Sequence, residues 1–216
     1  MELLITIIIY LHAFLGGLGL ITGVGSMAVT KGGKKHKKMG KIFSLSMVLS
    51  CILILPITWL PNHKSLFLFL ISLFTIYLVF IGNRSLTFKK RDKREADIID
   101  KGLSITMALF SSFMLIYGIY GLFNPVQDNA LFLVFGGLGF FLTFRNFQLY
   151  KTFKEKKIAW LLSHLTFMIA ALIASFTAFI VAGLHLWNIV AWVTPSIIGT
   201  IYIIYWRRKM RSKIKA

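Results

Sequence analysis

Residues 3–41 read LLITIIIYLHAFLGGLGLITGVGSMAVTKGGKKHKKMGK. Residues 3–30 hold no Asp, Glu, Lys or Arg, whereas six of the eleven residues 31–41 are Lys. An uncharged helix of about 20 residues crosses a hydrocarbon core about 30 Å thick. Lysines clustered at the end of such a helix keep that end in the cytoplasm. The stretch therefore predicts a transmembrane helix with its N-terminus outside and its other end inside.

The same alternation of apolar runs and basic clusters continues along the chain. Of the 25 Lys and Arg residues, all except Lys64 fall in the stretches 31–41, 84–101, 145–157 and 207–215. The apolar runs between these stretches alternate in direction if the basic stretches all lie on one side. This asymmetry is typical of a polytopic membrane protein, because Lys and Arg near span ends are retained on the cytoplasmic side.

Seven apolar segments are long enough to span a membrane. They cover residues 3–30, 42–60, 66–82, 103–123, 130–148, 158–183 and 188–206. Because the connectors are short, consecutive helices are expected to be antiparallel neighbours. We therefore expect an all-α protein, a single transmembrane domain of seven helices over residues 1–216, with its N-terminus outside and its C-terminus in the cytoplasm.

Composition supports the membrane class. Apolar residues make up 57% of the chain and charged residues 15%, which differs from a soluble domain. The net charge of +18 would indicate a nucleic-acid partner in a soluble protein. Here the charges flank apolar runs, so cytoplasmic retention and attraction to membrane lipids explain them, and no nucleic-acid partner is expected. Since Cys51 is the single cysteine, no disulfide or cysteine metal site forms within one chain.

Two histidines, His12 and His164, lie inside the predicted spans. Ionisable side chains at membrane depth are costly and usually functional. Gly16, Gly19 and Gly23 follow His12 at helical spacing and share its face. This smooth face admits either a closely packed helix, for which Gly19 and Gly23 form a GxxxG pair, or a flat ligand such as a porphyrin.

Two further histidines are candidate partners of this pair. His36, in the inner basic loop, is a candidate partner of His164. His185, in an outer loop, is a candidate partner of His12. Two bis-histidine sites, one in each leaflet, are how transmembrane b-type cytochromes hold haem b. At about 1.5 Å per residue, however, His12 is roughly 27 Å and His164 roughly 9 Å from the inner boundary, so both loops would have to re-enter the membrane. The alternative is a structural histidine bonded to a neighbouring carbonyl.

Other polar residues favour different functions. Thr194, Pro195 and Ser196 form a polar kink in the last span, and such interrupted helices often mark substrate sites, although Pro in a membrane helix is often only a bend. Arg145 interrupts the fifth span and either binds an anionic group or snorkels to the interface. These residues favour a transporter of small molecules or lipids.

A structural or assembly protein, acting as a homo-oligomer or with a membrane partner, is the third class. The sequence contains no HxxxH or HExxH pair, the histidine spacing that is typical of a zinc hydrolase. No metal centre is therefore assigned.

Three strings carry a family resemblance. Residues 11–43, LHAFLGGLGLITGVGSMAVTKGGKKHKKMGKIF, resemble the opening of a bacterial domain-of-unknown-function family of predicted polytopic membrane proteins. Residues 160–181, WLLSHLTFMIAALIASFTAFIV, are similar to the second block of that family, and residues 192–209, WVTPSIIGTIYIIYWRRK, to its closing helix. The resemblance implies a bacterial inner-membrane protein without implying a reaction.

The resemblance also implies that His12, His36 and His164 belong to one pattern. The chain departs from the family at Asn83, before the arginine that ends the third span, and at Asn146. These departures argue against a role for the inner ends of the third and fifth helices. Because His12 and His164 lie at membrane depth in the two leaflets, we expect a haem-binding or redox- or proton-linked membrane protein that uses its intramembrane histidines as ligands or proton-relay groups.

Overall fold

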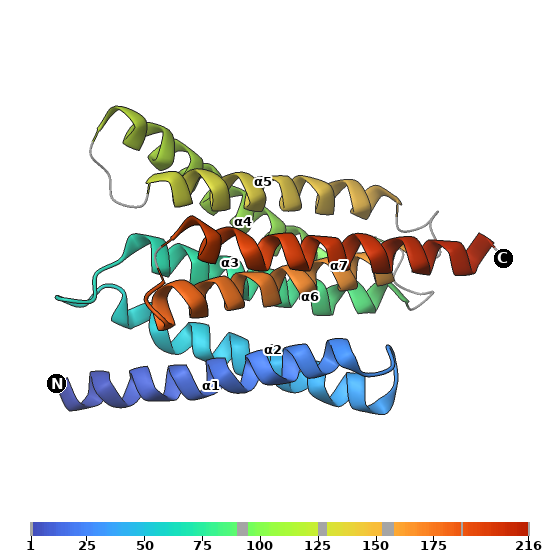
Figure 1. The fold of residues 1–216 in the computed structure, drawn as a ribbon. Coiled ribbons are helices and arrows are strands. Elements are labelled where there is room, and N and C mark those ends of the chain that lie inside the picture. The colour runs from blue at the N-terminus through green and yellow to red at the C-terminus, as the bar shows by residue number, and fades with distance from the viewer. Residues whose placement is uncertain (1, 90–94, 125–128, 153–157, 187, 216) are drawn as a thin grey trace. The chain divides into compact units, whose positions relative to one another are not determined.

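The chain folds into helices along nearly all of its described length. The computed structural model describes residues 2–89, 95–124, 129–152, 158–186 and 188–215. Seven α-helices follow one another in these residues (Figure 1). They are α1 (Glu2–Ala28), α2 (Lys34–Ile57), α3 (Leu66–Arg84), α4 (Ile98–Phe123), α5 (Asn129–Thr152), α6 (Ala159–Ala178) and α7 (Ile189–Lys215). The predicted all-α fold with seven helices is confirmed.

Two short helices extend the longer ones. The 3₁₀ helix η1 (Ser85–Lys89) continues α3, and the π-helix η2 (Phe179–Gly183) continues α6. Among the described residues, α1 to α6 are long and apolar enough to cross a membrane, with α3 counted through η1 and α6 through η2. The chain is therefore a multi-pass membrane protein. That α7 also spans, and that the N-terminus lies outside, stay predictions.

Several helices run beyond the apolar segments that predicted them. The second helix begins at Lys34 instead of residue 42, and the fourth at Ile98 instead of residue 103. The last helix continues to Lys215. Apolar runs mark the thickness of the hydrocarbon, whereas the backbone bonds of a helix continue through polar side chains, and Lys and Arg are good helix formers. His36 therefore lies in the first turn of α2 and not in a loop.

The described helices form two compact units. Unit 1 consists of Met1–Val79 and Met168–Arg208, and unit 2 of Phe80–Phe167 and Lys209–Ala216. Unit 1 contains the paired helices α1 and α2, and unit 2 contains the paired helices α4 and α5. Because α3 and α6 each contribute to both units, neither unit corresponds to a continuous piece of the sequence. The single transmembrane domain expected from the sequence stays a prediction.

In unit 1 the glycine face of α1 is filled by side chains. A Cβ at Gly19 would lie 2.4 Å from Met47 Cε, and one at Gly23 would lie 2.6 Å from Leu172 Cδ1 and 3.0 Å from Phe43 Cδ2. These distances are shorter than van der Waals contact, so only glycine lets α1 approach α2 and α6 this closely. A flat ligand does not fit beside Gly19 and Gly23 unless these side chains move.

We expect Gly23→Ala to destabilise the protein by about 1–3 kcal/mol, because the added methyl group overpacks the contact with Leu172 and Phe43. Gly17→Ala is the matched control, since a Cβ at Gly17 meets nothing within 4 Å. The control should gain about 0.5–1 kcal/mol from the lower backbone entropy of alanine. Reversible unfolding in mixed micelles measures both changes, and equal effects at the two positions would contradict close packing at Gly23.

Candidate functional site

Two half-buried histidines of unit 1 use the same ring nitrogen in the same way. The Nδ1 of His12, on α1, lies 2.9 Å from the carbonyl oxygen of Ser50, on α2. The Nδ1 of His36, on α2, lies 2.9 Å from the carbonyl oxygen of Ser26, on α1. The Ser50 hydroxyl returns a bond of 3.0 Å to the carbonyl of His12. Each histidine therefore links α1 to α2, His36 beside the turn that joins the two helices and His12 further along the pair.

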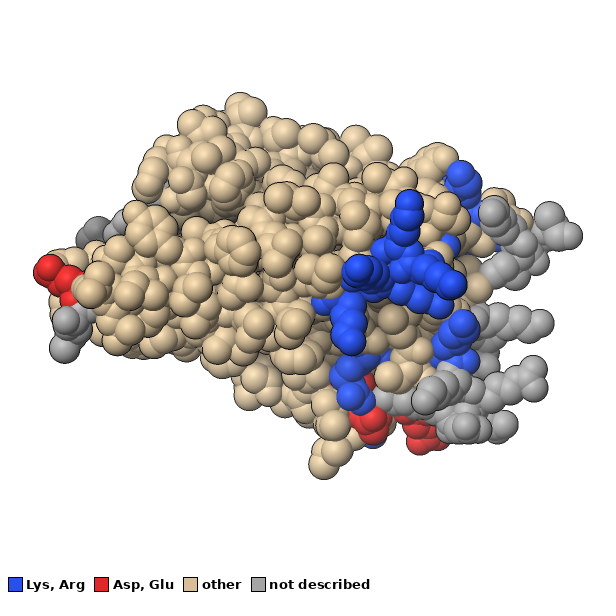
Figure 2. All heavy atoms as spheres, turned by 90° about the horizontal axis from the view of Figure 1, so that it is seen from below, with Lys and Arg blue, Asp and Glu red and all other residues tan. Residues whose placement is uncertain are grey.

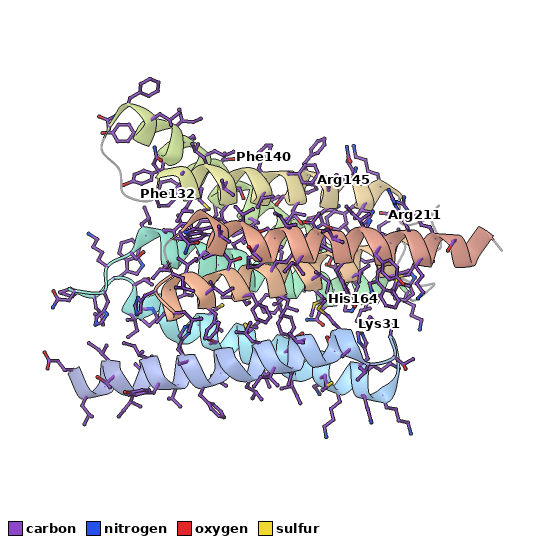
Figure 3. The ribbon with its side chains drawn as sticks, viewed as in Figure 1. Lys31, Phe132, Phe140, Arg145, His164 and Arg211 are labelled. Carbon is purple, nitrogen blue, oxygen red and sulfur yellow. The ribbon has the colours of Figure 1, made fainter. Side chains whose placement is uncertain are left out.

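A third histidine repeats this contact in unit 2. The Nδ1 of His164, on α6 (Figure 3), lies 2.8 Å from the carbonyl oxygen of Gly82, on α3. A carbonyl oxygen only accepts hydrogen bonds, so each of these contacts requires the proton on Nδ1. The Nδ1 of His12 also lies 2.9 Å from the Ser50 hydroxyl, which accepts from Nδ1 in this tautomer and donates to it in the other. With the proton on Nδ1, the lone pair of the neutral ring is on Nε2. Metal-ligating histidines have this arrangement, because a carbonyl or carboxylate that binds the second nitrogen orients the ring.

The same contacts also have a structural meaning. A hydrogen bond between a side chain of one helix and the backbone of the next stabilises the pair by about 0.5–1.5 kcal/mol. The contacts of His12 and His164 therefore agree with the structural interpretation as well as with the ligand interpretation. What distinguishes the two interpretations is whether Nε2 binds an added group.

The fourth candidate, His185, lies between η2 and α7. It is exposed and has a φ of +54°, a backbone conformation that is uncommon outside glycine. Within the described residues, no three His, Cys, Asp or Glu side chains gather into a group that could hold a metal ion. A zinc centre needs three or four such ligands, whereas a haem iron takes one or two axial ligands.

The residues predicted for a transport site lie on surfaces. Arg145 is exposed on α5 (Figure 3). Thr194 is exposed and Ser196 is half-buried on α7, on either side of Pro195, which lies inside the helix. A polar pathway through a membrane protein is normally lined by groups that face its interior. The exposure of Arg145 agrees instead with snorkelling to the interface.

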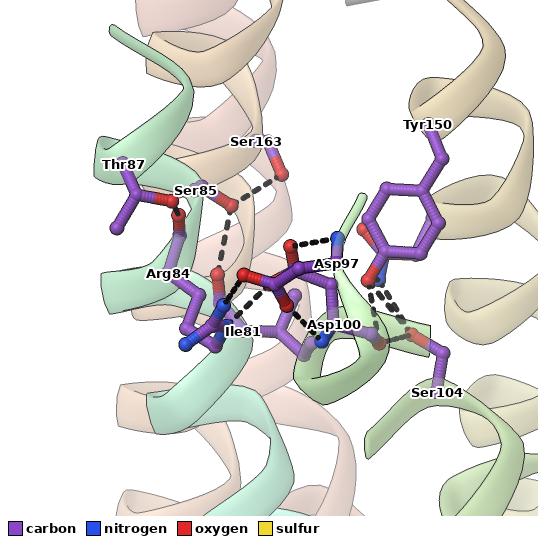
Figure 4. A network of polar contacts seen from close by, with 10 residues as sticks. Ile81, Arg84, Ser85, Thr87, Asp97, Asp100, Ser104, Tyr150 and Ser163 are labelled. Atoms are coloured by element: carbon purple, nitrogen blue, oxygen red, sulfur yellow. Dashed lines mark hydrogen bonds and ion pairs between the residues drawn. The ribbon is translucent and has the colours of Figure 1, made fainter. Parts of the chain in front are cut away.

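A partly buried polar cluster of unit 2 joins α3, α4 and α5 (Figure 4). Its members are Arg84, Asp97, Asp100, Ser104, Asn146 and Tyr150. Arg84 donates through Nε to Asp100 and through Nη2 to Asp97, the latter at 2.5 Å. The side chain of Asp100 is only 1% exposed and that of Asp97 is 45% exposed. Arg84 therefore neutralises one buried and one half-exposed carboxylate.

The two carboxylates meet because they cap α4. Asp97 Oδ1 accepts a 2.9 Å bond from the backbone N–H of Asp100, and Asp100 Oδ2 accepts a 3.2 Å bond from the N–H of Asp97. This reciprocal capping box satisfies two N–H groups that the helix itself cannot bond. It also places like charges side by side, which is unfavourable unless a cation lies between them. Arg84 supplies that cation.

The rest of the cluster fastens α4 to α5. The Tyr150 hydroxyl donates to the backbone carbonyl of Asp100 at 2.9 Å. Asn146 Nδ2 donates to Ser104 Oγ at 2.9 Å and to the Tyr150 oxygen at 2.6 Å. Ser104 and Asn146 are buried, so their bonds replace those that water would otherwise make. The cluster is thus an anchor for the ends of three helices.

Sequence analysis missed this cluster. The departures at Asn83 and Asn146 argued against a role for these helix ends, yet Asn146 is a central member. Two spacings in the sequence could have predicted the cluster. Asp97 and Asp100 have the spacing of a capping box, and Asn146 and Tyr150 are four residues apart and so share one face of α5.

Comparisons with protein-family models, with curated proteins and with solved structures find no match to this chain. The resemblance of residues 11–43, 160–181 and 192–209 to a bacterial membrane-protein family therefore stays a prediction. The function must be argued from the contacts of the histidines and of the polar cluster.

Proposed function

We propose that this multi-pass membrane protein binds haem b and carries electrons in the cytoplasmic membrane of a bacterium. His12 in unit 1 and His164 in unit 2 are the proposed iron ligands, and His36 and His185 are further ligand candidates. The observation that supports the proposal is the Nδ1 contact with a backbone carbonyl, because it leaves the lone pair of the neutral ring on Nε2.

The imidazole chemistry of these residues suits such a group, which would have to lie away from Gly19 and Gly23, where side chains fill the face of α1. Imidazole is a common axial ligand of haem iron, and a hydrogen bond from the other ring nitrogen raises its basicity and fixes its orientation. The carbonyls of Ser50 and Gly82 provide that bond to His12 and His164. When bound, haem would supply one-electron transfer. The chain itself orients the two rings and surrounds them with apolar helices.

Redox function is favoured over transport because His12 and His164 have defined backbone partners, whereas Arg145 and Thr194 are exposed. A structural or assembly role predicts the same histidine contacts without any added group. The two remaining classes therefore differ in one measurable property, which is the binding of haem.

We expect purified protein, expressed with haem supplied, to show a Soret band and an α band in its reduced-minus-oxidised spectrum. His63→Ala is the matched control, because His63 lies in the exposed connection between α2 and α3, outside the three-histidine pattern. Its spectrum should equal that of the parent protein. A folded protein with no haem bands would exclude the redox proposal and leave the structural class.

A further inference from the structure

One face of α2 changes from basic to apolar along its length. Residues at this spacing lie on one side of a helix of 3.6 residues per turn. The face contains Lys34, Lys38, Lys41, Leu45, Leu49 and Ile52. All six side chains are exposed, and the last three keep 59%, 41% and 50% of their surface accessible. The chain therefore presents cations at the start of the helix and a continuous apolar strip beyond them.

The positive charge at this end of unit 1 is not balanced within the unit. The one acidic residue in the sequence of unit 1 is Glu2, at the start of α1, whereas Lys34, Lys38 and Lys41 lie at the start of α2. In the part of the chain that the structure describes, these three lysines form no ion pair. Figure 2 shows basic side chains gathered at one end of the face that it displays. Such a surface attracts anions.

The backbone adds to this attraction. Gly33 caps α2 without any side-chain hydrogen bond to the first turn. The first N–H groups of the helix therefore lack a partner within it, and the positive end of the helix dipole lies beside Lys34. Helix starts of this kind bind phosphate groups when cations accompany them.

A further cation of this end, Lys31, contacts α7. Lys31 Nζ lies 4.9 Å from the ring centre of Trp206 and 5.7 Å from that of Tyr202. The same ammonium bonds to the last carbonyls of α1, and its pKa is lowered by burial. Lys31 therefore links the turn between α1 and α2 to α7.

We propose that this face of α2 binds one anionic phospholipid. Its phosphodiester lies among the cations Lys34, Lys38 and Lys41 at the start of the helix, and an acyl chain runs along Leu45 and Leu49 to Ile52. Ile52 follows Lys41 by 11 positions, which is roughly 17 Å at about 1.5 Å per residue. That length is close to half of a hydrocarbon core about 30 Å thick. A second copy of the chain would bring the same positive charge and is therefore not the occupant.

The test uses the full-length protein in nanodiscs of phosphatidylcholine with increasing phosphatidylglycerol. Thermal unfolding gives the phosphatidylglycerol concentration for half-maximal stabilisation. Lys38→Gln/Lys41→Gln removes two cations from the face, and Lys35→Gln/Lys37→Gln removes two neighbouring exposed cations on either side of it. Each lysine beside an anionic membrane contributes about fivefold in affinity, so we expect the first variant to raise that concentration about 25-fold. The second variant should change it far less.

Several results would overturn the lipid site. Equal shifts in the two variants would mean general surface attraction without a site. Equal stabilisation by phosphatidylcholine alone would mean that the phosphate charge is not recognised. Displacement of phosphatidylglycerol by an equal concentration of soluble glycerol phosphate would indicate a site for free phosphate. A change of oligomeric state in Lys38→Gln/Lys41→Gln would assign the face to a second copy. None of these readouts depends on haem.

Discussion

Arg84→Ala is expected to lower the free energy of unfolding by about 3–5 kcal/mol. The substitution leaves the carboxylate of Asp100, which is 1% exposed, without its cation and beside the carboxylate of Asp97. An uncompensated buried charge is among the costliest single changes in a folded protein. Unfolding in mixed micelles, compared with the parent protein, measures the loss.

Two further variants separate the buried pair from a general effect of charge. Arg145→Ala removes an equal charge from an exposed position on α5 and should change stability by less than about 0.5 kcal/mol. Arg84→Leu/Asp100→Leu removes the buried carboxylate together with its cation and should recover part of the loss, because no buried charge is then left unpaired. The loss of unfolding free energy in the double variant is compared with the summed losses of Arg84→Leu and Asp100→Leu. A larger loss in the double variant than in this sum would mean that the ion pair is not the source of the effect.

His164→Ala and His12→Ala are each expected to remove the haem signal that depends on the substituted ring, and the double variant should remove all of it. The reason is the loss of the Nε2 donor that the Gly82 or Ser50 carbonyl orients. Haem per protein and the amplitude of the α band measure the change.

Loss of folding could imitate loss of a ligand, so the histidine variants need a second readout. Imidazole added to His164→Ala should restore the α band if the ring is an iron ligand, since it supplies the missing donor. A purely structural histidine predicts no such recovery and predicts a stability loss of about 1–3 kcal/mol from the unpaired carbonyl. Full haem content in both single variants would reject these two residues as ligands.

The sequence predicted the number, order and class of the helices because apolar length is a local property. It placed the start of α2 at residue 42, eight residues after Lys34, because charge density marks the membrane boundary and not the end of a helix. Glycine at positions 19 and 23 indicated close packing, but which side chains fill the face depends on tertiary structure. The contacts with Met47 and Leu172 are therefore visible only in the fold.

The polar contacts were harder to predict for a related reason. Arg84 binds carboxylates 13 and 16 residues further along the chain, and a distance in sequence does not specify which of several acids is chosen. His12 and His164 were identified from their depth, yet their partners are backbone carbonyls, which every residue carries. The hydrogen-bond partner of each ring is therefore visible only in the structure.

The pairing of α1 with α2 and of α4 with α5 has a consequence for biogenesis. Each pair is joined by a short connection, so little loop-closure entropy opposes its association. The first hairpin can close as soon as its second helix has left the ribosome, before the C-terminal half of the polypeptide exists. The nascent chain would then enter the bilayer with its first two helices already paired.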